Sequence, residues 1–272
     1  MNFRKVFAMD FLQKENYTFY DLVEIMRILR MPDGCSWDRA QTHNSIRQEF
    51  IEETYEVIEA IDNNDIALLK EELGDVLLQV VFHAQIEKEK GNFNIDDVAD
   101  GVCKKLIVRH PHVFGNVKAD TVEEILNNWD NIKMQTKSQK TQTEVLESVS
   151  KALPSLMRSQ KLQSKAAKIG FDWKDINGAM DKLKEEVAEL DDAIQENNAV
   201  HMEEELGDVL FSAVNIARFT HTDAEKVLYN ACEKFIQRFA KMEQSAKEQN
   251  IVIEKADLDT LNQLWENAKN NK

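Results

Sequence analysis

A segment of seven residues, EELGDVL, occurs at 71–77 and again, letter for letter, at 204–210 of this 272-residue sequence. Glycine is a poor helix former, so its place inside two identical acidic helical segments needs a reason. Other distinctive residues recur around both segments in the same order and at nearly the same spacing. The matched pairs are Trp37 with Trp173, Glu53 with Glu186, Glu56 with Glu189, Glu72 with Glu205, Asp75 with Asp208, Lys105 with Lys234, Arg109 with Arg238, Trp129 with Trp265, and Lys133 with Lys269. An internal repeat of this kind predicts two copies of one structural module.

The repeat also suggests how the chain is divided. We expect an N-terminal extension at 1–19, a first module at 20–137, a linker at 138–154 and a second module at 155–272. The linker is polar at first and ends in Pro154, which suits a segment running into a helix. Only 8 Gly and 3 Pro occur, well below the roughly 7% and 5% of average proteins. Few residues that interrupt helices favour long helices and short turns, so we predict an all-α fold of two tandem antiparallel helix bundles.

Charge and cysteine content limit the partners and the compartment. The net charge is −15, which argues against binding to nucleic-acid polymers because neutralising their phosphates needs clustered Lys and Arg. No run approaches the roughly 18 uncharged apolar residues that a membrane span needs, so no membrane association is expected. The cysteines Cys35, Cys103 and Cys232 are scattered and form no CxxC motif. We therefore expect a soluble cytoplasmic protein with reduced cysteines.

The repeated carboxylates predict a metal site. Glu186 and Glu189 lie three residues apart in one expected helix, and Glu205 and Asp208 lie three apart in the next. This spacing places each pair on one edge of its helix. The loop between them, QENNAV, is short, so the helices should be antiparallel neighbours whose carboxylates face each other. The first copy repeats the pattern with Glu53, Glu56, Glu72 and Asp75.

Four like charges beside an apolar core are unstable unless they protonate or bind cations. Oxygen-only ligands suit a hard ion such as Mg²⁺, with Mn²⁺ as the alternative. The glycine that precedes Asp75 and Asp208 would leave room for a ligand or a facing helix. The competing interpretation is that these acids only form the solvated face of acidic helices. That explains a single ExxE motif better than two sets with identical spacing.

Basic and aromatic residues follow the acidic pairs in each copy. Lys234 and Arg238 lie one helical turn apart and could hold a polyphosphate, although the same spacing is common on solvated helix surfaces. Trp265 and Lys269 repeat this spacing near the end of the second module. The indole could stack on a base and the lysine could contact a phosphate, but a core position is equally compatible with the Trp.

The two copies differ at one chemically important position. Lys182, one turn before the first carboxylate of the second copy, has Glu49 as its counterpart in the first copy. This difference favours the second copy as the triphosphate site. The first copy alone carries an RHPH segment with His110 and His112. Such a pair can bind a metal, but a loop capped by Pro111 is the preferred interpretation.

The whole pattern resembles the MazG family of nucleoside triphosphate pyrophosphohydrolases, and the match covers nearly the entire chain. The first copy carries GCSWDRAQTHNSIRQEFIEETYEVIEAI, EELGDVLLQVVFHAQ and RHPHVFG, and the second carries GFDWKDI, EELGDVLF and EKFIQRF. The resemblance implies an all-α protein that assembles as a homodimer. It also implies Mg²⁺-dependent hydrolysis of nucleoside triphosphates, ATP among them, to monophosphate and pyrophosphate in a house-cleaning or stress-related role.

By position, the resemblance implies a role for each matched residue. The metal ligands would be Glu186, Glu189, Glu205 and Asp208. Residues in contact with the substrate would be Lys182, His201, Met202, Glu203, Glu204, Lys234, Arg238, Trp265 and Lys269. A second metal site would be formed by Glu53, Glu56, Glu72 and Asp75, and whether the first copy is itself active stays open.

The expected reaction is in-line attack of water on the α-phosphorus, with pyrophosphate leaving. Either Glu186 or Glu189 could orient or deprotonate this water, and the sequence does not choose between them. Lys234 and Arg238 would stabilise charge on the leaving pyrophosphate. The main alternative is a non-catalytic helical module that binds a nucleotide or a partner protein. Retention of all four carboxylates together with Lys and Arg in the second copy argues against it.

Overall fold

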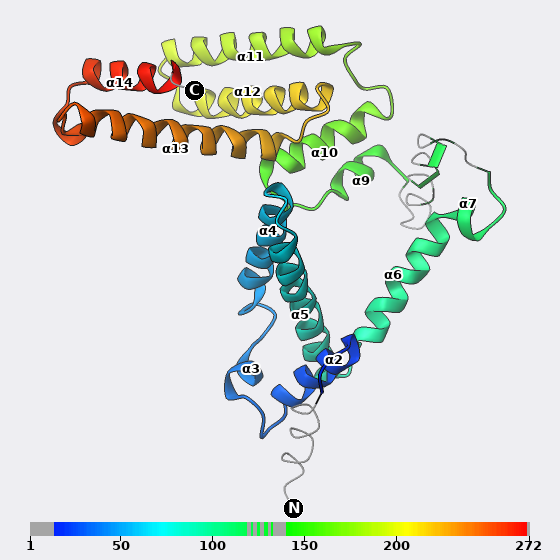
Figure 1. The fold of residues 1–272 in the computed structure, drawn as a ribbon. Coiled ribbons are helices and arrows are strands. Elements are labelled where there is room, and N and C mark those ends of the chain that lie inside the picture. The colour runs from blue at the N-terminus through cyan, green and yellow to red at the C-terminus, as the bar shows by residue number, and fades with distance from the viewer. Residues whose placement is uncertain are drawn as a thin grey trace, which may run out of the picture. The chain divides into compact units, whose positions relative to one another are not determined.

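The computed structural model describes residues 14–118, 121, 124–125, 128–129, 132 and 140–270. Within these residues every regular element is a helix, as the composition predicted. The chain separates into two compact units, Met1–Lys133 and Met134–Lys272 (Figure 1). Residues 1–13 of the expected extension and 138–139 of the expected linker lie outside the described residues, and the module boundaries stay predictions. No helix in the described part of the chain is long and apolar enough to cross a membrane.

Each unit is built around one long helical hairpin (Figure 1). Unit 1 contains α2 (Phe19–Leu29), α3 (Ser36–Ala40), α4 (Arg47–Asp62), α5 (Ile66–Lys90), α6 (Ile95–Arg109) and α7 (Pro111–Phe114). Unit 2 contains α9 (Gln142–Glu147), α10 (Ser155–Ala167), α11 (Ile176–Gln195), α12 (Ala199–Phe219), α13 (Ala224–Glu248), the 3₁₀ helix η1 (Ile253–Lys255) and α14 (Leu258–Asn270). The α4–α5 and α11–α12 hairpins correspond to each other, and in each the two helices pack together.

The same type of turn joins the two helices of each hairpin. Asn64 and Asn197 adopt left-handed backbone conformations, with φ of 54° and 53°, which asparagine tolerates better than most residues. The residues that follow, Asp65 and Asn198, then cap α5 and α12 by accepting hydrogen bonds from backbone N–H groups of the first turn. The helices are therefore antiparallel neighbours, as the short loops predicted.

Apolar faces of these helices form a separate core in each unit. The buried core of unit 1 consists of Met26, Ile46, Val81, Phe82 and Ile86. In unit 2 one cluster joins α13 to α14 and contains Met242, Ala246, Leu264 and Ala268. A second cluster lies on α12 and α13 and contains Val214, Ala217 and Ala224, with Leu156 of α10 packed against it. Helix α10 is thus held against the α12 side of the hairpin.

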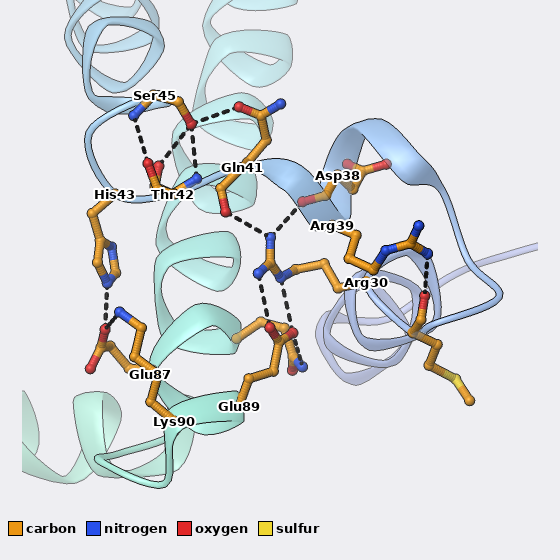
Figure 2. Close-up of polar contacts among 12 residues, drawn as sticks. Arg30, Asp38, Arg39, Gln41, Thr42, His43, Ser45, Glu87, Glu89 and Lys90 are labelled. Atoms are coloured by element: carbon orange, nitrogen blue, oxygen red, sulfur yellow. Dashed lines mark hydrogen bonds and ion pairs between the residues drawn. The ribbon is translucent and has the colours of Figure 1, made fainter.

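Arg30 organises the polar contacts around the end of α2 (Figure 2). Its side chain is 6% exposed and forms two hydrogen bonds with Glu89 of α5, at 2.9 Å from Nε and 2.8 Å from Nη2. Nη1 donates to the carbonyl oxygens of Asp38 and, at 3.3 Å, Gln41. The guanidinium also lies over the Phe82 ring, 5.3 Å from its centroid. One side chain therefore joins α2, the α3 segment and α5.

Replacing Arg30 with methionine should lower the free energy of unfolding by about 1–3 kcal/mol, because the carbonyl groups and Glu89 lose a buried donor. The matched control is Arg27→Met, because Arg27 pairs with Glu24 at the surface, where the two side chains are 35% and 36% exposed. That change should cost less than about 1 kcal/mol. Urea denaturation followed by circular dichroism measures both values, and equal losses would contradict the organising role of Arg30.

Candidate active site

Two helices of unit 2 bring three carboxylates together. Glu186 projects from α11, Glu205 and Asp208 project from α12, and one oxygen of each lies within 4.8 Å of the other two. Glu186 is 6% exposed, and the Glu205 side chain is 13% exposed. Glu189, one turn along α11, hydrogen-bonds with Glu186, and this contact, with desolvation, raises the pKa of Glu189. The structure thus brings Glu186, Glu205 and Asp208 close together and places Glu189 beside Glu186, and their role as metal ligands stays a prediction.

Basic groups on the same helices neutralise part of this cluster. Lys182 Nζ lies 2.6 Å from Glu185 Oε1 and 2.8 Å from Glu186 Oε1. Hydrogen bonds with Glu185 and Glu186 raise the pKa of Lys182, which keeps the ammonium charged. His201 Nε2 lies 3.1 Å from Glu205 Oε1. One lysine does not balance four carboxylates, so negative charge remains for a cation to neutralise.

The donor set fits a hard divalent cation. All four candidate ligands are carboxylates, which are the oxygen donors that Mg²⁺ and Mn²⁺ prefer. Thiolate or further imidazole donors, which softer metals favour, are not part of the described cluster. The other residues at the start of α12 differ in position, since Met202 is half-buried whereas Glu203 and Glu204 are exposed.

A cavity of about 610 Å³ adjoins the carboxylate cluster. Lys182, Glu186 and Asp208 belong to its wall. The remaining wall is mostly apolar or aromatic and comes from α9, α10, the GFDW segment at 170–173, and α12. This volume lies within the range typical of small-ligand sites, and such sites combine an apolar wall with a few polar groups.

The GFDW segment is fixed to α12 by an ion pair. Asp172 accepts hydrogen bonds from both terminal guanidinium nitrogens of Arg218, one of them at 2.9 Å, and from the Trp173 backbone N–H at 2.8 Å. A Cβ atom added to Gly178 would lie 3.3 Å from Trp173 Cε3, so the indole packs on the start of α11 through a glycine. Sequence reasoning used GFDW only as a family marker and assigned no site role to Asp172, Trp173 or Arg218. The signal that could have found them is the tryptophan that recurs at the same place in both copies.

Four predicted substrate contacts lie on a different part of unit 2. Lys234 and Arg238 are on α13, and neither belongs to the cavity wall. Trp265 of α14 packs against Phe235 of α13, with ring centroids 5.1 Å apart. Lys269 pairs with its neighbour Glu266 at 2.6 Å. None of these four residues belongs to the cavity wall, and their roles stay predictions.

The first copy forms a comparable acidic cluster from a different set of three. Oxygens of Glu53, Glu56 and Glu72 lie within 4.8 Å of one another. Desolvation and the neighbouring carboxylates, Glu56 foremost, raise the pKa of Glu72 to about 6. Desolvation, followed by the charge of Asp75, also raises the pKa of Glu53. These shifts are what crowded carboxylates without a bound cation should show. In this copy the position of Lys182 is taken by Glu49, which adds charge of the same sign.

The later basic residues of the first copy pack around Trp129. The Arg109 guanidinium lies 5.5 Å from the Trp129 ring centroid, and the His110 ring meets the indole edge to face at 4.8 Å. Pro111 is the first residue of the four-residue helix α7, where a loop was expected. Lys133, the predicted partner of Trp129, lies outside the described residues.

The repeated glycines face open space in the isolated chain. A Cβ atom added to Gly74 or Gly207 would meet no atom within 4 Å. The close approach expected at these positions is therefore not made by any described part of the chain itself. The leucines on either side of Gly207, Leu206 and Leu210, are both exposed. The room that each glycine leaves is available for a ligand or for a second chain.

Comparisons with known proteins identify relatives over nearly the whole chain. A family model described as the MazG nucleotide pyrophosphohydrolase domain matches residues 41–114 and again residues 175–242. The chain is 44% identical to the nucleoside triphosphate pyrophosphohydrolase/pyrophosphatase MazG of Thermotoga maritima, over 95% of this chain and 98% of that protein. It is 41% identical to the nucleoside triphosphate pyrophosphohydrolase of Escherichia coli K12, over 91% and 95% of the two chains. A Bacillus subtilis protein, the uncharacterized protein YabN, is 43% identical over 93% of this chain and 52% of its own length.

Mg²⁺ should stabilise the folded chain, because it binds carboxylates that only the fold brings together. A ligand at about 100 times its dissociation constant adds about 2.7 kcal/mol. The double variant Glu186→Gln/Asp208→Asn should lose most of this gain. Without metal it should be more stable than the wild type, because two like charges are gone.

Thermal unfolding in EDTA and in excess MgCl₂ measures both effects, and Glu53→Gln/Glu72→Gln is the matched control for the first copy. A full Mg²⁺ response in both double variants would contradict metal binding at these clusters.

Proposed function

Because this chain belongs to the MazG family of nucleotide pyrophosphohydrolases, we propose that it hydrolyses nucleoside triphosphates to nucleoside monophosphates and pyrophosphate. The observation that carries the proposal is the cluster of Glu186, Glu205 and Asp208, with ligand atoms within 4.8 Å, beside a cavity of about 610 Å³. A triphosphate is a polyanion that needs cations, whereas a nucleoside needs an apolar wall. Unit 2 supplies both next to each other.

The proposed cofactor is Mg²⁺, with Mn²⁺ as the alternative, held by Glu186, Glu189, Glu205 and Asp208. When bound, the ion would neutralise charge on the triphosphate and lower the pKa of a water molecule. The partial neutralisation by Lys182 supports this proposal, because it leaves negative charge that a divalent cation can balance.

The chain's own side chains would orient the reactants. In-line attack of water on the α-phosphorus requires a carboxylate that accepts a proton from the water, and Glu186 and Glu189 both lie where they could do so. Lys182 forms an ion pair with Glu186. When a metal ion binds the Glu186 carboxylate, the Lys182 ammonium would be free to contact the phosphates. Lys234 and Arg238 would stabilise the leaving pyrophosphate. Since they lie outside the cavity wall, they would act at its mouth or from a second copy of the chain.

We assign turnover to unit 2 rather than to unit 1. The first copy keeps four carboxylates and would bind a metal, but Glu49 stands where the second copy has Lys182. A carboxylate at this position repels a triphosphate. The first copy is therefore proposed as a metal-binding module without its own hydrolysis.

The proposed assembly is a homodimer. Exposed leucines surround a glycine that no part of the described chain approaches, and burying apolar surface is the main driving force for association. The proposed setting is the cytoplasm, where the three free cysteines stay reduced. There the enzyme would remove unwanted nucleotides.

Pyrophosphate release from a panel of ribo- and deoxyribonucleoside triphosphates, with and without Mg²⁺, tests the proposed function. The wild type should release pyrophosphate only with the metal, and Glu186→Ala should lower kcat/KM by about 100-fold or more, since several kcal/mol of charge stabilisation are lost. The matched change in the first copy, Glu53→Ala, should leave kcat/KM within about threefold, which is less than 1 kcal/mol of transition-state stabilisation. Hydrolysis that survives Glu186→Ala would reject the site, and loss in Glu53→Ala alone would reverse the choice of unit. Binding without turnover would identify a regulatory module instead.

Sedimentation velocity tests the assembly. The wild type should sediment with twice the mass of a 31.4 kDa chain, and Leu210→Glu should shift it to the monomer because a charge would be buried against a second copy. Leu258→Glu, another change at an exposed leucine, is the control and should leave the dimer intact. A monomeric wild type at micromolar concentration would contradict the proposal.

A further inference from the structure

Two histidines of the first copy share one hydrogen bond. His43 lies in the segment between α3 and α4, and His83 lies on α5. Their Nδ1 atoms are 2.6 Å apart, and the planes of the two rings are inclined by only 11°. One of these nitrogens must donate and the other must accept, so a single proton lies between the rings.

Glu87 binds the other side of the His43 ring (Figure 2). His43 Nε2 lies 2.5 Å from Glu87 Oε1. Hydrogen bonds from Asn92, Lys90 and His43 lower the pKa of Glu87 to about 2, so that this carboxylate is an ionised acceptor at neutral pH. His43 Nε2 must therefore carry a hydrogen atom. Neutral His43 then accepts from His83 at Nδ1, whereas protonated His43 donates to it.

The contact limits the two histidines to one positive charge. An imidazolium carries hydrogen on both of its nitrogens, so two imidazolium rings cannot hydrogen-bond with each other. A second proton would also place two like charges in contact. Desolvation and the charge of His43 already lower the pKa of His83. The two rings can therefore hold a second proton only if they separate.

The helices packed against α5 are α2, α4 and α6. From α4, the uncharged Phe50 ring meets His83 edge to face, with ring centroids 5.8 Å apart. From α2, the Arg30 guanidinium is bound by a carboxylate of α5 and by backbone carbonyl oxygens. From α6, Asp97 accepts a hydrogen bond from the backbone N–H of the residue that caps its own helix. Among the described side chains, the α5 carboxylate and the lysine bound to it thus connect the histidines to other charges.

A metal ion is the alternative that two imidazole rings suggest. Glu87 lies at Nε2 of His43, however, whereas His83 lies at Nδ1, so the three side chains do not converge on one point. Within the described part of the chain, the groups of three or more possible ligands are the two carboxylate clusters. The geometry therefore favours a shared proton.

The segment that His43 anchors leads directly into α4. Thr42 and Ser45 each accept a hydrogen bond from the backbone N–H of the other, at 3.2 Å and 2.9 Å, so residues 41–46 form a small folded unit (Figure 2). Ile46 is fully buried in the core but provides no side-chain cap for α4. The attachment of this segment to α5 therefore helps to hold the start of α4, and its loss would be a local opening.

The second copy has no equivalent of this contact. The two EELGDVL segments align α5 with α12, so that Ile216 and Thr220 stand in place of His83 and Glu87. Residues 174–185, which precede the first carboxylate of the second copy, contain no histidine. Any effect of the two histidines should therefore be confined to the first copy.

We propose that His43 and His83 form a pH-sensitive switch, in which one shared proton holds residues 41–46 and the start of α4 against α5, and uptake of a second proton releases them. The open form binds protons with the ordinary imidazole pKa of about 6.5, above that of His83 in the closed form. The closed form therefore loses stability as the pH falls below this value. This switch does not depend on the proposed hydrolysis.

Nuclear magnetic resonance tests the shared proton in the wild-type chain. With ¹⁵N-labelled histidine, a coupling between two Nδ1 atoms across the hydrogen bond should be present at about pH 7.5 and absent at about pH 5, on either side of the ordinary imidazole pKa. A missing coupling at the higher pH, or one that persists at the lower pH, would overturn the switch.

Hydrogen exchange measured by mass spectrometry tests the release. After correction for intrinsic rates, protection of residues 41–50 should fall by about tenfold between about pH 7.5 and pH 5, whereas residues 175–184 of the second copy should change by less than about twofold. A local measurement is needed because the raised pKa of Glu72 makes the fold more stable as the pH falls, which is the opposite effect. Unchanged protection of residues 41–50 would contradict the release.

His83→Asn is the informative variant, because asparagine places an amide near the position of Nδ1 but cannot take up a proton. Its protection over residues 41–50 should differ by less than about twofold between the two pH values. His221→Asn is the matched control, because His221 is exposed and has a left-handed backbone that asparagine tolerates. It should keep the tenfold change. A tenfold change that survives in a folded His83→Asn would overturn the proposal, and the wild-type coupling decides the question if this variant does not fold.

Discussion

Mutual repulsion of carboxylates is the constraint on which the rest of the structure depends. Glu186, Glu189, Glu205 and Asp208 are forced together by a hairpin whose packing is apolar and whose turn is short. The hairpin cannot relax this repulsion by opening, because α11 and α12 are held by the Asn197–Asn198 turn and by their packed faces. The charge is instead reduced locally by the Lys182 ammonium and by a hydrogen bond between Glu186 and Glu189. This uncompensated negative charge favours cation binding and so supports the proposed Mg²⁺ site.

The two copies respond to this constraint in different ways, although their hairpins follow one plan. In the second copy a lysine approaches the cluster, and the wall beside it stays open. In the first copy another acid takes the place of that lysine, and desolvation together with the neighbouring carboxylates raises the pKa of Glu72 to about 6. The first copy also places Phe82 in its core, with the buried Arg30 guanidinium over the ring. The same helical frame thus supports a site in one copy and a packed core in the other.

Much of this could be predicted from the sequence, because it depends on local spacing. The helices, the antiparallel hairpins and the convergence of the carboxylates follow from residues three and four apart and from loops too short to permit another arrangement. The cavity could not be predicted in this way. Its wall depends on hydrogen bonds between residues more than forty positions apart in the sequence, Gln163 with Phe211 and Asp172 with Arg218. Local spacing in the sequence does not indicate such long-range contacts. The order of the repeat paired Lys234 and Arg238 with Lys105 and Arg109, but order alone does not say whether residues of α13 belong to the cavity wall.

The Arg30–Glu89 pair has a consequence for assembly of the chain during folding. Tandem modules with near-identical hairpins risk exchanging elements, so that a helix of one copy docks on the hairpin of the other. Helix α5 has 25 residues and α12 has 21, so α12 ends one turn earlier and offers no equivalent of Glu89. If α2 docked on α12, the Arg30 guanidinium would be desolvated without a carboxylate, which is strongly unfavourable. The Arg30–Glu89 ion pair therefore favours docking of α2 on the hairpin of its own copy and disfavours docking of α2 on the hairpin of the other copy.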